Sequence, residues 1–82
     1  MSNFKSLMRR ADTMRRHDAV HSDWWTGYIR GLRRAHHGEM FGTDAEHALF
    51  LSASESDDPS RASLGRGYRA GLTMTAADPD AE

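Results

Sequence analysis

Five histidines are the side chains best suited to metal binding or proton transfer in this chain of 82 residues, which contains no cysteine. His17 and His21 have the i, i+4 spacing with which two histidines of one helix bind zinc. The residues between them break the helical pattern, however, so the two rings do not share a face. His36 and His37 point about 100° apart on a helix, so the two rings would bind one ion only in a distorted site. We therefore predict neither a metal site nor a cofactor.

A second cluster that suggests proton chemistry is His47 with Asp44 and Glu46. Consecutive polar residues are ordinary in the first turn of a helix, where they satisfy free backbone amides. No nucleophilic side chain is placed beside a base, which acyl-transfer chemistry would need. We predict that the protein has no catalytic residues and is not an enzyme.

Arginine dominates the basic residues, which are ten Arg and one Lys. Residues 1–37 hold eight Lys and Arg against three Asp, whereas residues 38–82 hold three Arg against nine Asp and Glu. A charge separation of this kind steers an oppositely charged partner or holds two halves of a domain together. The candidate partner-binding arginines lie in the first two predicted helices: Arg9, Arg10, Arg16, Arg30, Arg33 and Arg34.

Aromatic side chains form the second group of candidate contacts, because Trp and Tyr are enriched in protein interfaces. Trp24 and Trp25 point about 100° apart, so we expect one of them at the margin of a small core. Phe50 falls outside the expected inward arc of its helix and would then anchor a foreign protein or a second copy of the chain. Trp24 and Phe50 are therefore predicted to bind a partner. The alternative is that these rings, with Phe41, only fill the core.

Four helices must position these residues. Apolar residues recur every three to four positions over residues 3–17 and 22–37, with Ser22 as the expected N-cap of the second helix. Residues 39–42 read as a loop. A capping box at Thr43 and Glu46 starts a third helix that ends near residue 54, and Asp58 followed by Pro59 starts a fourth that runs to about residue 74. The expected inward side chains of the third helix are Ala45, Ala48, Leu49 and Leu51.

A repeated hexapeptide sets the expected architecture. Residues 27–32 read GYIRGL and residues 67–72 read GYRAGL. Glycine within a helix costs about 1 kcal/mol relative to alanine, so two pairs of glycines indicate that another helix approaches closely. We expect the two copies to face each other about a pseudo-twofold axis. The predicted fold is all-α, a compact four-helix bundle of two pseudo-repeated hairpins in a single domain of residues 1–74, followed by an acidic, frayed tail of residues 75–82.

The chain shows no apolar run long enough to cross a membrane and no charged segment followed by a hydrophobic stretch. The absence of cysteine fits a reducing compartment. We therefore expect a soluble, cytoplasmic protein without membrane contact.

Residues 25–38 (WTGYIRGLRRAHHG) and 41–47 (FGTDAEH) resemble small uncharacterised proteins of proteobacterial phages, plasmids and integrated elements. The resemblance covers about residues 22–72. It implies a stoichiometric inhibitor of host defence, as anti-CRISPR proteins are, whose partner is a host protein or nucleoprotein complex. The alternative from another class is a small DNA-binding transcriptional regulator that uses the arginines of the first two helices.

Overall fold

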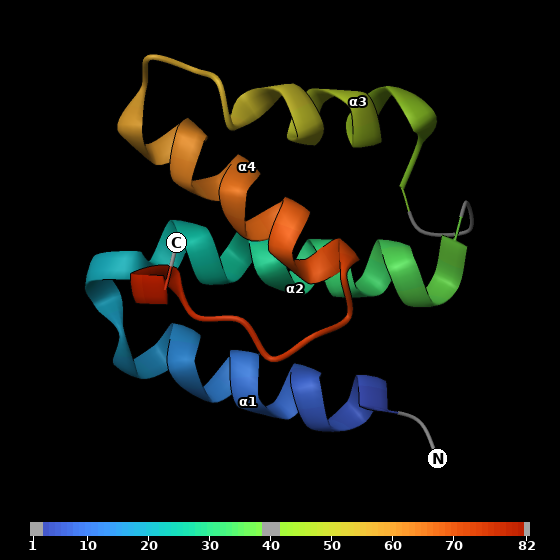
Figure 1. The fold of residues 1–82 in the computed structure, drawn as a ribbon, viewed down its shortest axis with the longest axis vertical. Coiled ribbons are helices and arrows are strands. Elements are labelled where there is room, and N and C mark those ends of the chain that lie inside the picture. Colours follow the sequence, from blue (N-terminus) through green and yellow to red (C-terminus); the bar gives the residue numbers. More distant parts are fainter. Residues whose placement is uncertain (1–2, 39–41, 82) are drawn as a thin grey trace.

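The computed structural model describes residues 3–38 and 42–81, and the elements in these ranges are all helical (Figure 1). Four α-helices follow one another as α1 (Asn3–His17), α2 (Ser22–His37), α3 (Asp44–Ala53) and α4 (Pro59–Leu72). The described ranges also contain the short 3₁₀ turns η1 (Ala19–His21) and η3 (Pro79–Ala81). The four predicted helices are thus confirmed. Of the predicted loop, residues 39–41, including Phe41, lie outside the described ranges.

The helix starts show which capping signals operate. The Thr43 hydroxyl accepts the Glu46 amide at 3.1 Å, and the Asp58 carboxylate accepts the Ser60 amide at 3.2 Å with proline in the first turn, as predicted. Ser22 is not the N-cap of α2, as was expected, but its first residue. Because η1 runs directly into α2, the Ser22 amide donates to the Ala19 carbonyl instead of needing a side-chain cap.

Two helical hairpins make up the molecule. Helices α1 and α2 run side by side in opposite directions, and α4 turns back obliquely from the end of α3 toward α2 (Figure 1). The hairpins meet where α4 crosses α2, so that α1 and α3 lie on the outer sides. This arrangement confirms the predicted all-α bundle of two hairpins.

The repeated hexapeptides form the crossing of α2 and α4, and their glycines make it close. A Cβ atom on Gly27 would lie 1.9 Å from the Leu64 carbonyl oxygen, and one on Gly67 would lie 1.9 Å from the Trp24 carbonyl oxygen. The interval from residue 24 to residue 64, and from residue 27 to residue 67, equals the interval between the two hexapeptides. The contacts of one copy therefore repeat those of the other, as the expected pseudo-twofold relation requires.

The core lies between the α1–α2 hairpin and the crossing. Its buried cluster consists of Leu7, Ala11, Trp24, Trp25, Tyr28 and Leu32. Trp24 stacks on Tyr28 with ring centroids 5.2 Å apart, and the two tryptophans meet edge to face at 4.8 Å. Trp24 and Trp25 are only 2% and 0% exposed, so the expectation that one lies at the margin is wrong. Because α2 is the central helix and is covered from more than one side, its buried arc holds both rings.

Helix α3 has a different inward face from the one expected. Its His47 and Phe50 turn toward α4, where Nδ1 of His47 lies 2.5 Å from the Tyr68 hydroxyl and Phe50 stacks on the Tyr68 ring at 4.8 Å. Consequently Ala45, Ala48 and Leu49 are exposed, contrary to the prediction, and Leu51 is only partly buried. The stacking of Phe50 and the hydrogen bond of His47, both with Tyr68, set the rotation of the helix and leave Leu49 outside.

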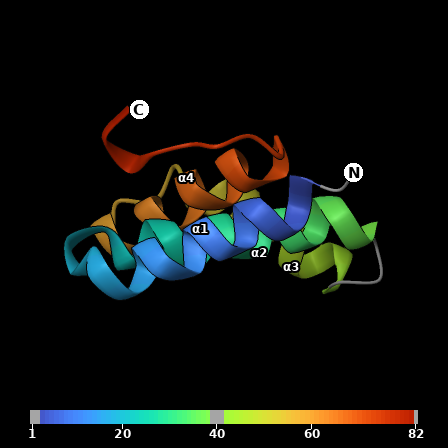
Figure 2. The same cartoon turned by 90° about the horizontal axis from the view of Figure 1, so that it is seen from below.

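Residues 75–81 were expected to form a frayed tail, whereas the structure places them along one face of the helices (Figure 2). The Tyr28 hydroxyl donates to the Thr75 carbonyl oxygen, and Met74 and Ala77 pack against the core cluster. Met74 itself has φ of 56°, which turns the chain sharply back after α4. The segment therefore covers part of the core.

Candidate binding surface

Four arginines of α1 and α2 line a groove between these two helices. Arg9 and Arg15 come from α1, and Arg30 and Arg33 come from α2. The groove has a volume of about 590 Å³. Arg30 and Arg33 are three residues apart and share one face of α2, whereas Arg9 and Arg15 reach the hollow from either side of Asp12 on α1. We call this surface the α1–α2 basic groove.

A second hollow continues the groove toward the start of α1 and the end of α2. Its volume is about 560 Å³, and it shares Met8, Arg9 and Arg33 with the first. Lys5 adds another positive charge at this end. Met8, which lines both hollows, and Ile29, which lines the first, are partly buried and supply apolar surface between the charges.

One carboxylate, Asp12, is among the residues that line the larger hollow. It pairs with Arg15 at 3.2 Å and with Arg16 at 3.1 Å. All three side chains are more than 40% exposed, so these pairs are screened and contribute little to stability. The pairing leaves the groove with a positive excess.

The structure divides the six predicted arginines into two groups. Arg9, Arg30 and Arg33 line the basic groove, and Arg16 is exposed on α1 beside it. Arg10 instead lies over the Trp25 ring, 5.2 Å from its centroid, and thus belongs to the packing of the core.

Arg34 is also engaged within the molecule. Its guanidinium is 3.0 Å from the Asp44 carboxylate, and its side chain is only 11% exposed. The pair connects the end of α2 to the start of α3, so Arg34 joins the two hairpins. Arg10 and Arg34 thus each make a contact within the molecule.

The two aromatic candidates are not free to act as anchors. Trp24 is buried in the core, and Phe50 is half-buried between the Tyr68 ring and the Arg30 guanidinium, which lies 5.2 Å from its centroid. The expectation that Phe50 is exposed is wrong because the register of α3 differs. Leu49 beside it, which was expected inside, is exposed instead.

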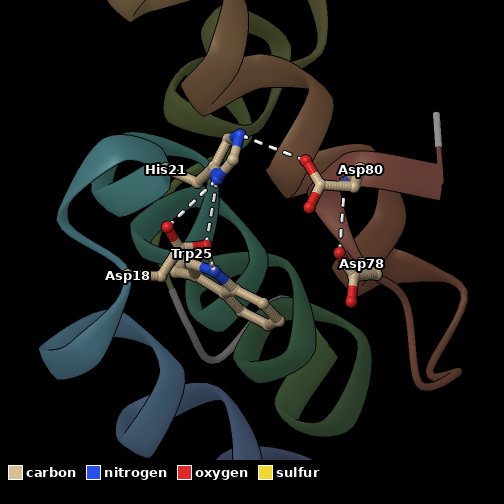
Figure 3. A network of polar contacts seen from close by, with 5 residues as sticks. All are labelled: Asp18, His21, Trp25, Asp78 and Asp80. Carbon is tan, nitrogen blue, oxygen red and sulfur yellow. Dashed lines mark hydrogen bonds and ion pairs between the residues drawn. The ribbon is translucent and has the colours of Figure 1, made fainter.

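A polar network that the sequence did not suggest joins η1 to the end of the chain (Figure 3). The Asp18 carboxylate accepts from Nε1 of Trp25 at 3.1 Å and lies 3.0 Å from Nδ1 of His21. Nε2 of His21 lies 3.5 Å from the Asp80 carboxylate, and the Asp80 amide donates to Asp78 at 3.1 Å. The hydrogen bond from Trp25, with the help of His21, lowers the pKa of Asp18.

This network places a carboxylate beside each ring nitrogen of His21. The i, i+3 spacing of Asp18 and His21 is the one part visible in the sequence, because Asp80 reaches the ring only through the return of the C-terminal segment. In residues 3–38 and 42–81, no three His, Asp or Glu side chains are grouped to hold a metal ion.

His47, the other candidate for proton chemistry, is a hydrogen-bond partner of a core tyrosine. Burial raises the pKa of Tyr68, and burial likewise raises the pKa of Tyr28. A phenol held neutral in this way serves as a donor to His47 or to a backbone carbonyl. Of the neighbouring acids, Asp44 binds Arg34 and Glu46 lies in the capping turn.

In comparisons with known proteins, no family model, no curated protein and no solved structure matches the chain. Within the described ranges, none of the helices is both long enough and apolar enough to span a lipid bilayer.

Proposed function

We propose that this protein is a non-catalytic binding protein that inhibits a bacterial defence complex by docking the α1–α2 basic groove on a negatively charged surface of it, in the manner of anti-CRISPR proteins. The observation that carries the proposal is the convergence of Arg9, Arg15, Arg30 and Arg33 on one hollow. The proposed location is the cytoplasm, where such complexes act.

The chemistry of the groove favours binding to carboxylates or phosphates. Each guanidinium presents a planar set of donors that matches these anions in a bidentate way. Apolar surface from Met8 and Ile29 between the arginines gains from being covered, and a charged rim accelerates encounter with an oppositely charged surface.

The same groove also suits a second candidate function, a DNA-binding regulator, because exposed arginines on two helices contact phosphates as readily as carboxylates. The packing of α1 against α2 argues against it. A helix-turn-helix reader crosses its two helices at a steep angle and projects the second into the major groove. Here the helices run side by side in opposite directions, and the arginines are spread over both.

Charge reversal in the groove tests the proposed function. The variant Arg9→Glu should lose most of the protein recovered with the wild type from a bacterial lysate, and its expression should no longer relieve interference against phage. The matched control is Arg66→Glu, an exposed position of α4 outside the groove, which should behave as the wild type. Equal recovery with both variants, or no stoichiometric partner of the wild type, contradicts the proposal.

Binding to duplex DNA separates the two candidates. A regulator that neutralises several phosphates binds heparin and duplex DNA with an affinity that falls steeply as salt is raised. The inhibitor hypothesis expects stoichiometric capture of a protein complex that persists after nuclease treatment. Tight, salt-dependent binding to DNA together with loss of the captured complex after nuclease favours the regulator.

A further inference from the structure

The outer face of α3 carries apolar side chains that the rest of the molecule does not cover. Leu49 is 69% exposed, and Ala45 and Ala48 on the same face are also exposed. The core does not use this face because His47 and Phe50 occupy the side toward α4. A large exposed apolar side chain within an apolar face marks an interaction site more often than an exposed apolar side chain that stands alone.

A hollow lies directly beside Leu49, between α3 and α4. Its volume is about 440 Å³, and its apolar lining comes from Leu49, Phe50, Ala53 and Leu64. Three charged residues also line it: Glu46 from the first turn of α3, Arg61 from the first turn of α4, and Arg30 of α2, whose guanidinium lies over the Phe50 ring. We call Leu49 and this hollow the α3 face.

We propose that the α3 face binds a second copy of this chain, with the two α3 helices antiparallel across a twofold axis near Leu49. Leu49 lies close to the middle of α3, which runs from Asp44 to Ala53. A twofold axis at this point lets each Leu49 enter the hollow of the other copy. The contact is then isologous, because each copy offers both the protruding side chain and the hollow.

Two charged residues of the α3 face, Glu46 and Arg61, complement each other in this arrangement, while Arg30 stays over the Phe50 ring of its own copy. Glu46 lies toward the start of α3, whereas Arg61 lies near its end, beside Ala53, because α4 begins just after α3. A twofold rotation about Leu49 exchanges the two ends. Glu46 of each copy is therefore brought to the side of Arg61 of the other, and two opposite-charge pairs flank the apolar centre. This complementarity is why a second copy fits the face.

The first test measures self-association of the full chain by analytical ultracentrifugation across a wide range of protein concentration. The wild type should sediment as a dimer, and Leu49→Ala should raise the dissociation constant by about 100-fold, because apolar burial is lost twice in a symmetric contact. Val20→Ala is the control, since Val20 is 88% exposed but lies in η1. A wild type that stays monomeric at every concentration overturns the proposal, as does equal dimerisation of Leu49→Ala.

Charge reversal tests the arrangement of the two copies. In the homodimer of Glu46→Arg, two arginines lie opposite each other, and in the homodimer of Arg61→Glu, two glutamates do. Either change should weaken the homodimer by about tenfold. An equimolar mixture of the two variants restores both opposite-charge pairs and should form a heterodimer close to wild-type affinity. This recovery also shows that both variants are folded. A mixture no tighter than the separate variants rejects the antiparallel pairing.

The proposal does not depend on the proposed function, because the α3 face and the basic groove use different residues apart from Arg30, which borders both. Arg9→Glu should leave the dimer unchanged while it abolishes capture of a defence complex. Leu49→Ala should weaken the dimer in purified protein whatever the result of that capture. Each hypothesis therefore fails separately.

Discussion

Substitution of Gly67 by alanine tests the account of the crossing between α2 and α4. The added Cβ would lie 1.9 Å from the Trp24 carbonyl oxygen, 2.8 Å from the Trp24 carbonyl carbon and 3.0 Å from the Tyr28 amide nitrogen. All three atoms belong to the backbone of α2, so no side-chain rotation relieves the contact. The helices must separate or the crossing must rearrange.

The expected cost follows from these distances. A carbon and an oxygen atom in contact need about 3.3 Å, so α4 has to move from α2 by more than about 1 Å. Overpacking of a core costs about 1–3 kcal/mol, and a clash with rigid backbone belongs at or above the top of this range. Alanine recovers about 1 kcal/mol of helix propensity over glycine. We expect a net loss of about 3 kcal/mol, against a total stability of roughly 4–12 kcal/mol for a domain of this size.

Thermal and denaturant unfolding followed by circular dichroism measure this loss. A loss of about 3 kcal/mol should lower the melting temperature by roughly 15 °C. Arg66→Ala, at an exposed position of α4, is the control for helix propensity and should change stability little. If Gly67→Ala melts within a few degrees of the wild type, or above it, the close crossing is refuted.

The pseudo-twofold relation adds a sharper expectation. Gly27→Ala meets the Leu64 carbonyl oxygen at the same 1.9 Å, so its effect should match that of Gly67→Ala within about 1 kcal/mol. One separation of α2 from α4 relieves both clashes. The double variant should therefore lose clearly less than the sum of the two single losses, whereas full additivity would indicate two independent local defects.

Three further predictions concern the polar contacts and the C-terminal segment. Since the pKa of Asp18 is lowered in the folded protein, its stabilising effect is present above the unfolded pKa of about 3.9 and is lost as pH falls through the folded value. Asp18→Asn should thus reduce stability at neutral pH and show a smaller further loss on acidification; an unchanged acid dependence contradicts this role. Truncation after Met74 removes the acceptor of the Tyr28 hydroxyl and the cover of the core, and should cost about 2 kcal/mol in urea unfolding, whereas an unchanged midpoint would mean that the segment does not pack. Both tyrosines should ionise above pH 10 in an ultraviolet absorbance titration, because burial raises both pKa values, and a normal midpoint in folded protein would contradict their burial.

The sequence predicted the helices and the crossing well because these depend on local and repeated signals. Capping residues at Thr43 and Asp58 mark helix starts through contacts within three residues. The two hexapeptides indicate close packing because glycine pairs have a cost that only an approaching helix offsets.

The candidate binding surface was only partly predictable. The charge separation singled out the arginines of α1 and α2, but nothing local distinguishes Arg9 and Arg33, which line the groove, from Arg34, which binds Asp44 in the next hairpin. Likewise, Trp24 and Trp25 are neighbours whose burial depends on how many helices cover α2. Whether such a side chain is exposed or buried depends on residues from distant segments of the chain. The local spacing in the sequence therefore does not decide it.

By itself, then, the sequence determined the helical class, the four helices with most of their ends, and the glycine-lined crossing, because each depends on neighbouring residues or on an internal repeat. Only the tertiary structure decided the rotation of α3, which turns Phe50 inward and Leu49 outward, and the return of residues 75–81 over the core. The apolar residues of α3 do not form one clear stripe, so its rotation is set by stacking on Tyr68 in another helix, and the C-terminal segment is held by contacts with Tyr28 and His21 far back in the chain.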